Sequence, residues 1–189
     1  MTDYTGDMSC AAQACDAHHE VERAQADRVA GPRLSGLLAL WQQAHRGGRA
    51  LPPRSGFRHR QLFQWMGNLY LFQVQRTPLA MKATLVGTHW VGLTGLEFTG
   101  QRLDSAARAG RNGRLYEPFF RAVETATPLY AYSAHPALPG ALHRLILPCA
   151  EDGNTIDCLL CAGYAHDRLE RALMGRKLAP YLGHNPDLI

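Results

Sequence analysis

The pattern of hydrophobic positions in the first quarter of the chain predicts two helices. Apolar side chains recur at the spacing of one helix face at Leu34, Leu37, Leu38 and Trp41. We expect this helix to end at Gly47-Gly48. The preceding residues 9–29 are rich in alanine, glutamine and glutamate, which favour a helix, but they hold few large aliphatic side chains. We therefore expect a surface helix there, ended by Gly31-Pro32.

Five later segments have the short, aromatic, β-branched or alternating composition of β-strands. They are residues 68–74, 81–87, 128–135, 141–148 and 156–165. Closely spaced glycines in residues 88–113 exclude a regular strand and favour short helical turns. Apolar positions predict a helix over residues 116–126 and a last helix over residues 167–178.

The order of these segments predicts an α+β fold with one antiparallel sheet. Because the strands come in consecutive groups, we expect five antiparallel strands with helices packed on one face. We divide the chain into an N-terminal tail and helix (1–33), one domain (34–166) and a C-terminal helix and tail (167–189). The β-β, helix, β-β-β order of the middle part is the order of a PAS domain.

The composition is that of a packed globular protein, and two further features of the sequence bear on its cellular location. Of 189 residues, 46% are hydrophobic and 19% are charged. No apolar run approaches the roughly 18 residues of a membrane span. The first ten residues carry acids and no basic segment, which is not the pattern of a secretory signal. We therefore expect a cytoplasmic protein without a membrane partner.

The net charge of +4 comes almost wholly from arginine. The cluster Arg54, Arg58 and Arg60 could attract an anion or an acidic partner, although a solvated basic surface is the simpler interpretation. No helix-turn-helix, RNA-recognition or zinc-finger pattern accompanies these bases. We therefore do not expect nucleic-acid binding.

Cysteine usage favours reduced thiols in the core. The chain has an odd number of cysteines, at Cys10, Cys15, Cys149, Cys158 and Cys161. Cys158 and Cys161 form a C-x-x-C pair, but they fall on a predicted strand, where side chains three apart point to opposite faces. We therefore interpret them as structural residues and expect neither a metal site nor a redox pair.

Three segments carry a more specific pattern. Trp41 precedes a Gly-Arg-Ala-Leu-Pro-Pro-Arg loop, and Leu85-Val86-Gly87-Thr88 precedes Thr99-Gly100. Arg144 begins an Arg-Leu-Ile-Leu-Pro segment that is followed by a glycine turn and a final apolar strand. In this order and spacing, residues 34–166 resemble a family of standalone bacterial PAS-like proteins that is common in alphaproteobacteria. One departure is Phe57-Arg58, where that family usually has an Asp-Pro pair.

The resemblance implies a non-enzymatic sensory or regulatory domain in bacterial signalling. It would bind a small, largely apolar ligand, a protein partner or both, and it would form a homodimer through flanking helices. The implied ligand cavity lies between the sheet and the helices. Its expected lining is Trp90, Phe98, Phe119, Phe120, Val123, Tyr130, Tyr132, Leu145, Leu147 and Leu160. The alternative is that these side chains simply fill a core.

The identity of the cofactor or ligand stays open, and two groups are disfavoured. The predicted helix 116–126 has no histidine, so haem b in the usual PAS pose is not expected. Residues 88–113 contain no cysteine, which disfavours a flavin photosensor of the LOV type. His89 could bind a ligand or titrate near neutral pH, although a satisfied histidine is the simpler interpretation.

Two other classes of function remain as alternatives. One is a ligand-free PAS-like interaction or scaffold protein. The other is a small NTF2-like enzyme that uses an Asp/His pair for proton transfer. The available residues are Asp104, Asp157, His135 and His143, and nothing in the sequence brings an aspartate within reach of a histidine.

Overall fold

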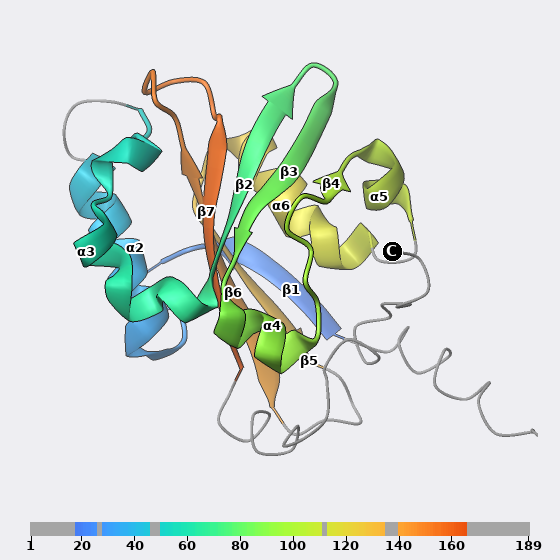
Figure 1. Ribbon diagram of the computed structural model, residues 1–189, viewed down its shortest axis with the longest axis horizontal. Helices are drawn as coiled ribbons and strands as arrows, with labels where there is room; N and C mark the ends of the chain where they lie inside the picture. The colour runs from blue at the N-terminus through green and yellow to red at the C-terminus, as the bar shows by residue number, and fades with distance from the viewer. Residues whose placement is uncertain (1–17, 26–27, 46–49, 111–112, 135–139, 166–189) are drawn as a thin grey trace, which may run out of the picture.

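The protein has an α+β architecture built on one seven-stranded antiparallel sheet (Figure 1). The computed structural model describes residues 18–25, 28–45, 50–110, 113–134 and 140–165. The strands are β1 (His18–Arg23), β2 (Leu69–Arg76), β3 (Leu79–Val86), β4 (Arg102–Leu103), β5 (Leu129–Ala134), β6 (Ala141–Cys149) and β7 (Cys158–Ala165). Their order across the sheet is β1-β5-β6-β7-β2-β3-β4, so the hairpin β2–β3 and the meander β5–β7 meet where β2 pairs with β7.

The five central strands coincide with the five predicted strand segments. The predicted strand count is nevertheless wrong, because β1 and β4 extend the sheet at its two edges. β4 has only two residues and pairs with β3 at Met81 and Lys82. The predicted helical turns of residues 88–113 are present as α4 and α5, on either side of this short strand.

The N-terminal helix predicted over residues 9–29 is wrong for residues 18–23, which form β1. This strand pairs with β5 from His18 opposite Ala134 to Arg23 opposite Leu129. Ala24 continues the ladder, since its N–H donates to the carbonyl of Pro128 at 2.9 Å. The backbone partners offered by the edge of β5 outweigh a modest helix propensity. Residues 9–17 and the predicted helix 167–178 lie outside the described residues.

Each described helix comes either before the β2–β3 hairpin or between that hairpin and the β5–β7 meander. They are α2 (Gly31–His45), η2 (Arg54–Gly56), α3 (His59–Leu62), η3 (Phe63–Asn68), α4 (Thr88–Thr94), α5 (Ser105–Ala109) and α6 (Gly113–Thr125). Within the described part of the chain, no helix is both long enough and apolar enough to cross a bilayer. α2 carries the predicted apolar face, and Leu34, Leu37, Leu38 and Trp41 are all buried.

Helices cover both faces of the sheet, which corrects the expectation of one covered face. In Figure 1, α2 and α3 lie on one side of the strands and α4, α5 and α6 on the other. On the α2 side, Trp41 Nε1 donates to the carbonyl of Pro148 at 2.9 Å, and the Arg33 guanidinium lies 5.4 Å from the centre of the Tyr164 ring. We call the two sides of the sheet the α2 face and the α6 face.

The α6 helix begins three residues earlier than predicted, at Gly113, so that Pro118 lies inside it. A side chain at Gly113 would come within 2.1 Å of the Arg108 carbonyl oxygen. Arg108 then joins α5 to α6, because its guanidinium forms ion pairs with Glu117 and Glu124. These contacts hold α5 and α6 together over the sheet.

Candidate functional site

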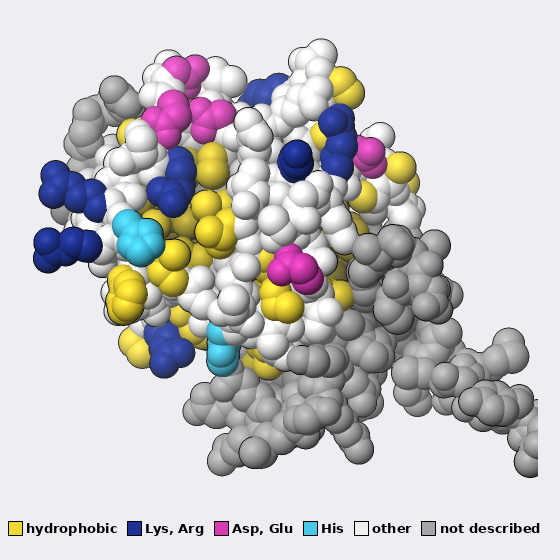
Figure 2. Space-filling model, in the orientation of Figure 1, with side chains coloured by type: hydrophobic (Ala, Val, Ile, Leu, Met, Phe, Trp, Pro, Cys, Tyr) yellow, Lys and Arg dark blue, Asp and Glu magenta, His cyan; other side chains and the backbone are white. Residues whose placement is uncertain are grey.

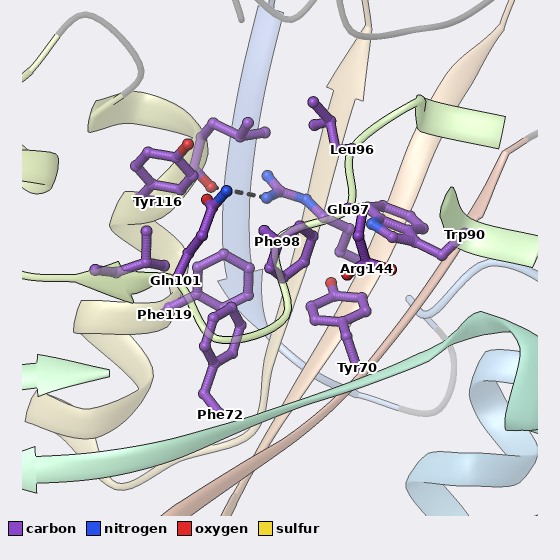
Figure 3. A pocket seen from close by; sticks show the side chains of 12 residues that line it. Tyr70, Phe72, Trp90, Leu96, Glu97, Phe98, Gln101, Tyr116, Phe119 and Arg144 are labelled. Atoms are coloured by element: carbon purple, nitrogen blue, oxygen red, sulfur yellow. Dashed lines mark hydrogen bonds between the residues drawn. The ribbon is translucent and has the colours of Figure 1, made fainter. Parts of the chain in front are cut away.

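A cavity of about 50 Å³ lies between α6, α4, the segment that leads from α4 into β4, and the α6 face of the sheet. This volume is enough for a few water molecules. The lining side chains are predominantly apolar (Figure 3). They belong to Tyr70, Phe72, Trp90, Leu96, Glu97, Phe98, Gln101, Leu103, Leu115, Tyr116, Phe119 and Arg144.

Aromatic rings form most of the wall. Tyr70 and Phe72 are two residues apart on β2, so both side chains point to the α6 face. The Tyr70 ring centre lies 5.1 Å from that of Trp90 and 6.0 Å from that of Phe119. Phe98 stacks on Phe72 at 5.9 Å. Edge-on and stacked contacts of this kind hold flat surfaces around the cavity.

Trp90 reaches the cavity wall because its neighbour on β7 is a glycine. A Cβ atom at Gly163 would lie 2.0 Å from the Trp90 ring. Gly163 pairs with Arg144 in the sheet, and its carbonyl accepts a hydrogen bond from Asn68 Nδ2 at 2.9 Å. The close approach of ring and backbone therefore depends on the missing side chain.

Arg144 brings a positive charge into this apolar site. It stands on β6, and only 2% of the residue is exposed. Its Nη1 donates to the Leu115 carbonyl of α6 at 2.7 Å, and its Nη2 donates to Ser133 Oγ at 3.3 Å. The guanidinium carbon lies 5.7 Å from the centre of the Phe119 ring, within the range of a cation–π contact.

No carboxylate among the described residues forms an ion pair with Arg144. The acid in the cavity lining is Glu97, which is exposed and whose Oε1 accepts from the Thr99 N–H at 2.8 Å. That hydrogen bonding to Thr99 lowers the pKa of Glu97. The groups that favour the charged guanidinium are Tyr70 and Cys161. Burial raises the pKa of both, so both stay neutral at pH 7.

Burial also lowers the pKa of Arg144, since desolvation disfavours the charged form. A guanidinium nevertheless keeps its charge at neutral pH. The site therefore holds a desolvated cation that is compensated by a carbonyl, a hydroxyl and a ring face. Burying such a cation destabilises the folded protein unless an anion pairs with it.

Three polar atoms of the cavity lining have no hydrogen-bond partner among the described residues. They are Tyr70 Oη, Trp90 Nε1 and Arg144 Nε. Buried polar groups are normally paired, and each unpaired one destabilises the folded protein. All three atoms can donate a hydrogen bond. The cavity therefore offers several donors and a positive charge among aromatic walls.

Three of the predicted lining residues do line this cavity, namely Trp90, Phe98 and Phe119. Phe120 and Val123 are buried on α6 but do not reach it. Tyr130 and Tyr132 line a separate hollow with Glu20 and Glu22 of β1.

The remaining predicted residues point to the α2 face of the sheet. Leu145 and Leu147 flank Arg144 and Ile146 on β6, so their side chains alternate to the opposite side. Leu160 is the cross-strand partner of Leu147 and shares its face. All three leucines have no exposed surface, and they belong to the packed core beneath α2.

Sequence reasoning missed the two residues that most define the site, Tyr70 and Arg144. The signal for Arg144 was its position inside the apolar strand ALHRLILP, where a charged residue among leucines needs a partner. The signal for Tyr70 was its i, i+2 relation to Phe72, which puts both side chains on one face of a strand.

The described residues considered for acid–base chemistry do not line the cavity. Asp104 caps α5 by accepting from the Ala106 N–H at 3.0 Å. Asp157 accepts from the Glu151 N–H at 2.8 Å. His143 stacks on Tyr130, and His89 is exposed on α4. His135 lies outside the described residues.

The C-x-x-C cysteines point to opposite faces, as the sequence predicted. Cys158 is opposite Cys149 in the register, whereas Cys161 is opposite Ile146 and Tyr70. Burial raises the pKa of Cys158 to about 12 and also raises that of Cys149. In the described part of the chain, no three His, Cys, Asp or Glu side chains are grouped to hold a metal ion.

The arginines on the surface differ from Arg144 in their exposure to solvent. Arg58 and Arg60 are exposed, and Figure 2 shows basic side chains projecting into solvent beside α3. Exposed charges of this kind are hydrated and weakly selective. We therefore take the cavity, and not this surface, as the candidate site.

Comparisons of the chain with protein-family models, with curated proteins and with solved structures found no match.

Proposed function

We propose that this chain is a non-enzymatic, PAS-like sensory or regulatory domain of the bacterial cytoplasm, which binds a small molecule in the cavity beneath α6. The position of the cavity is the observation that carries this proposal. It lies between the sheet and the helices that connect β3 to β5. The resemblance to PAS-like proteins places a ligand in the same region.

The succession of elements supports the PAS-like part of the proposal. β2 and β3 form a hairpin, α4 to α6 follow, and β5, β6 and β7 complete the sheet. The pairing of β2 with β7 closes the central five strands into one layer. The edge strands β1 and β4 are additions outside this central unit.

The chemistry of the lining supports binding over catalysis. Among the described residues, the lining includes no histidine, cysteine or serine, which are frequent nucleophiles and general bases. Its carboxylate, Glu97, is exposed and accepts a hydrogen bond from the Thr99 N–H. Asp104 and Asp157 are engaged by backbone N–H groups elsewhere. The aromatic walls and Arg144 can instead hold and orient a ligand.

We further propose that the bound state is transmitted through protein contact, either with a partner or with a second copy of the chain. Among the described strands, β1 pairs with β5 alone, and an edge strand can accept another strand. Sedimentation at increasing concentration tests the second copy. A monomer at every concentration would leave only a different protein as the partner.

A cavity-filling substitution tests ligand binding. Leu103 is half-buried and lines the cavity, so Leu103→Trp should occupy the space and block uptake. Leu85→Trp is the matched control, since Leu85 is also half-buried but lies outside the lining. The probes are benzyl alcohol, benzamide and benzoate. Their binding is measured by thermal shift and by tryptophan fluorescence.

We expect the parent and Leu85→Trp to bind at least one probe and Leu103→Trp to bind none. Native mass spectrometry of the protein purified from a bacterial host provides a second readout, in which a retained small molecule should disappear in Leu103→Trp. Equal uptake by both variants would remove the cavity as the site. Failure of the parent to bind any probe or retain any ligand would favour a ligand-free interaction protein.

A further inference from the structure

We infer that the cavity selects a small organic monocarboxylate, whose carboxylate lies against Arg144 and whose apolar body lies against the aromatic walls. This inference deepens the proposed function and rests on it. It names the chemical class of the ligand. It is carried by the juxtaposition of a buried guanidinium and two other unpaired donors in one aromatic cavity.

The guanidinium has an unused edge that fits a carboxylate. Nη1 and Nη2 each make one hydrogen bond, to α6 and to β5, and these fix the plane of the group. Nε has no partner among the described residues. A carboxylate can accept from Nε and from the neighbouring terminal nitrogen at the same time, which is the geometry that Arg provides and Lys does not.

The charge of the site fits a single negative charge. Arg144 is the cation of the lining, and the described residues provide no buried carboxylate to neutralise it. The acid of the lining, Glu97, is exposed to solvent and hydrogen-bonded to Thr99, so it does not pair with the guanidinium. A monoanion would bring the buried charge to zero. A dianion such as a phosphate ester would leave an uncompensated negative charge in an apolar cavity, which is costly.

The two other unpaired donors point to hydrogen-bond acceptors on the ligand. Figure 3 shows the Tyr70 hydroxyl and the Arg144 guanidinium on the same side of the cavity, with Trp90 beside them. The Tyr70 and Trp90 rings are in contact, with their centres 5.1 Å apart. A carboxylate has two oxygens with several lone pairs, so one anion can satisfy Arg144 and a second donor together.

The apolar part of the ligand is indicated by the rest of the wall. Phe72, Phe98 and Phe119 have no polar atoms in their side chains, and Leu96, Leu103 and Leu115 add aliphatic surface. The other lining residues are Glu97, Gln101 and Tyr116. The flat rings suit a planar or slender body. The volume of about 50 Å³ is smaller than the roughly 150 Å³ of a cavity that binds benzene. A short aliphatic monocarboxylate therefore fits most readily, and an aromatic one requires the lining side chains to move apart.

The test compares probes with the same ring and different charge. Benzoate, benzamide and phenylphosphonate are titrated into the full chain by calorimetry at about pH 8.5, where the phosphonate is a dianion, with tryptophan fluorescence as a second signal. We expect benzoate to bind at least about tenfold more tightly than the other two, because it alone matches the single charge. The same ranking is expected for hexanoate over hexanamide.

Two variants of the cation link the preference to Arg144. Arg144→Met should remove the preference, so that benzoate binds no more tightly than benzamide. Arg144→Lys keeps the charge but loses the planar edge, so it should retain only part of the preference for benzoate over benzamide. Arg102→Met is the control, since Arg102 is exposed on β4 and its Nη1 bonds to Gln75; it should leave the preference unchanged.

The possible failures are distinguishable. If benzoate and benzamide bind the parent equally, the monocarboxylate inference is overturned while ligand binding stands. If phenylphosphonate binds more tightly than benzoate, the single-charge argument is overturned. If no probe binds the parent at all, the inference and the proposed function both fail. If Arg144→Met does not fold, the probe ranking in the parent and in Arg144→Lys still decides.

Discussion

The α2 face and the α6 face of the sheet use the same strands but hold different kinds of side chain. On the α2 face, Leu145, Leu147 and Leu160 have no exposed surface and pack beneath an amphipathic helix. On the α6 face, aromatic rings surround a cavity, and a buried arginine stands among them. A packed apolar core of the first kind stabilises the folded protein. A cavity and a buried charge, as on the α6 face, reduce its stability.

The unpaired polar groups of the cavity lining indicate why the α6 face differs from the α2 face. Tyr70, Trp90 and Arg144 each leave a donor unused among the described residues, and all three line the cavity. Such groups reduce stability in the empty protein. A region that gives up stability in this way is expected where a ligand binds. Substitutions on the two faces should therefore affect different properties.

The largest effect on stability is expected on the α2 face. Leu147→Ala removes a side chain with no exposed surface and leaves a hole that the neighbouring strands cannot fill. It should lower the free energy of unfolding by about 3 kcal/mol. Leu103→Ala, on a half-buried lining residue of the α6 face, should cost about 1 kcal/mol.

Urea denaturation of both variants measures this difference. Benzoate affinity is the second readout, and Leu147→Ala should keep the parent value at temperatures where it is folded. The comparison of the two faces would be wrong if the two variants lost equal stability, or if Leu147→Ala weakened binding as much as Leu103→Ala did.

The next effect concerns the contact between Trp90 and β7. Gly163→Ala places a methyl group 2.0 Å from the Trp90 ring, so the ring must move. We expect a loss of about 2 kcal/mol in stability and a shift in tryptophan emission. Gly92→Ala is the control, because a Cβ at Gly92 meets nothing within 4 Å and lies in helix α4. An unchanged emission spectrum in Gly163→Ala would contradict this packing.

Both faces contribute to an alkaline loss of stability. Burial raises the pKa of Cys149, Cys158, Cys161 and Tyr70 in the folded state. Above the unfolded thiol pKa of about 9, the unfolded chain loses protons that the folded protein keeps. Stability is therefore complete below that pH and falls as the pH rises toward the folded values. Each thiol contributes about 1.4 kcal/mol per pH unit.

The alkaline loss is measured by urea unfolding between pH 8 and pH 10.5. Cys161→Ala removes one of the groups, so its stability should fall with a shallower slope than that of the parent. A parent whose stability does not change over this range would contradict the burial of the thiols.

The smallest effect distinguishes the two faces most sharply, because its sign should differ between Tyr70 on the α6 face and Tyr130, which is opposite Leu145 in the register and so lies on the α2 face. Tyr70→Phe removes an unpaired buried hydroxyl and should raise stability by up to about 1 kcal/mol. It should also weaken benzoate binding several-fold. Tyr130→Phe removes a hydroxyl that bonds to His143 Nδ1, and it should lower stability by about 1 kcal/mol. Equal signs in thermal denaturation would contradict the assignment of Tyr70 to the site.

The strand segments and α6 could be predicted from the sequence because their patterns are local. Alternation or β-branched composition located β2, β3, β5, β6 and β7, and the spacing of Phe119, Phe120 and Val123 located α6. β1 could not be predicted, because its residues favour a helix by composition. What makes them a strand is the free edge of β5, a partner about 110 residues away in the chain.

The cavity lining could be predicted only in part, for a reason that β6 makes clear. A strand covered on both faces is apolar at every position, so hydrophobic alternation does not reveal which side chains point to the cavity. The prediction that Leu145 and Leu147 line the cavity is therefore wrong, and Arg144, between His143 and Leu145, is the residue of β6 that lines it. The charged residue marks the face of the proposed binding site, and the leucines lie on the face that is packed beneath α2.

The measurement that tests the central claim most directly is the NMR signal of the Arg144 Nε–H group, identified by its loss in Arg144→Met. We predict a separate signal in the free protein, because the group is buried. Saturating benzoate should shift it strongly, whereas benzamide should leave it in place. An Arg144 signal that stays unchanged when benzoate is bound would show that the acid binds elsewhere, and it would contradict a carboxylate site built around this arginine.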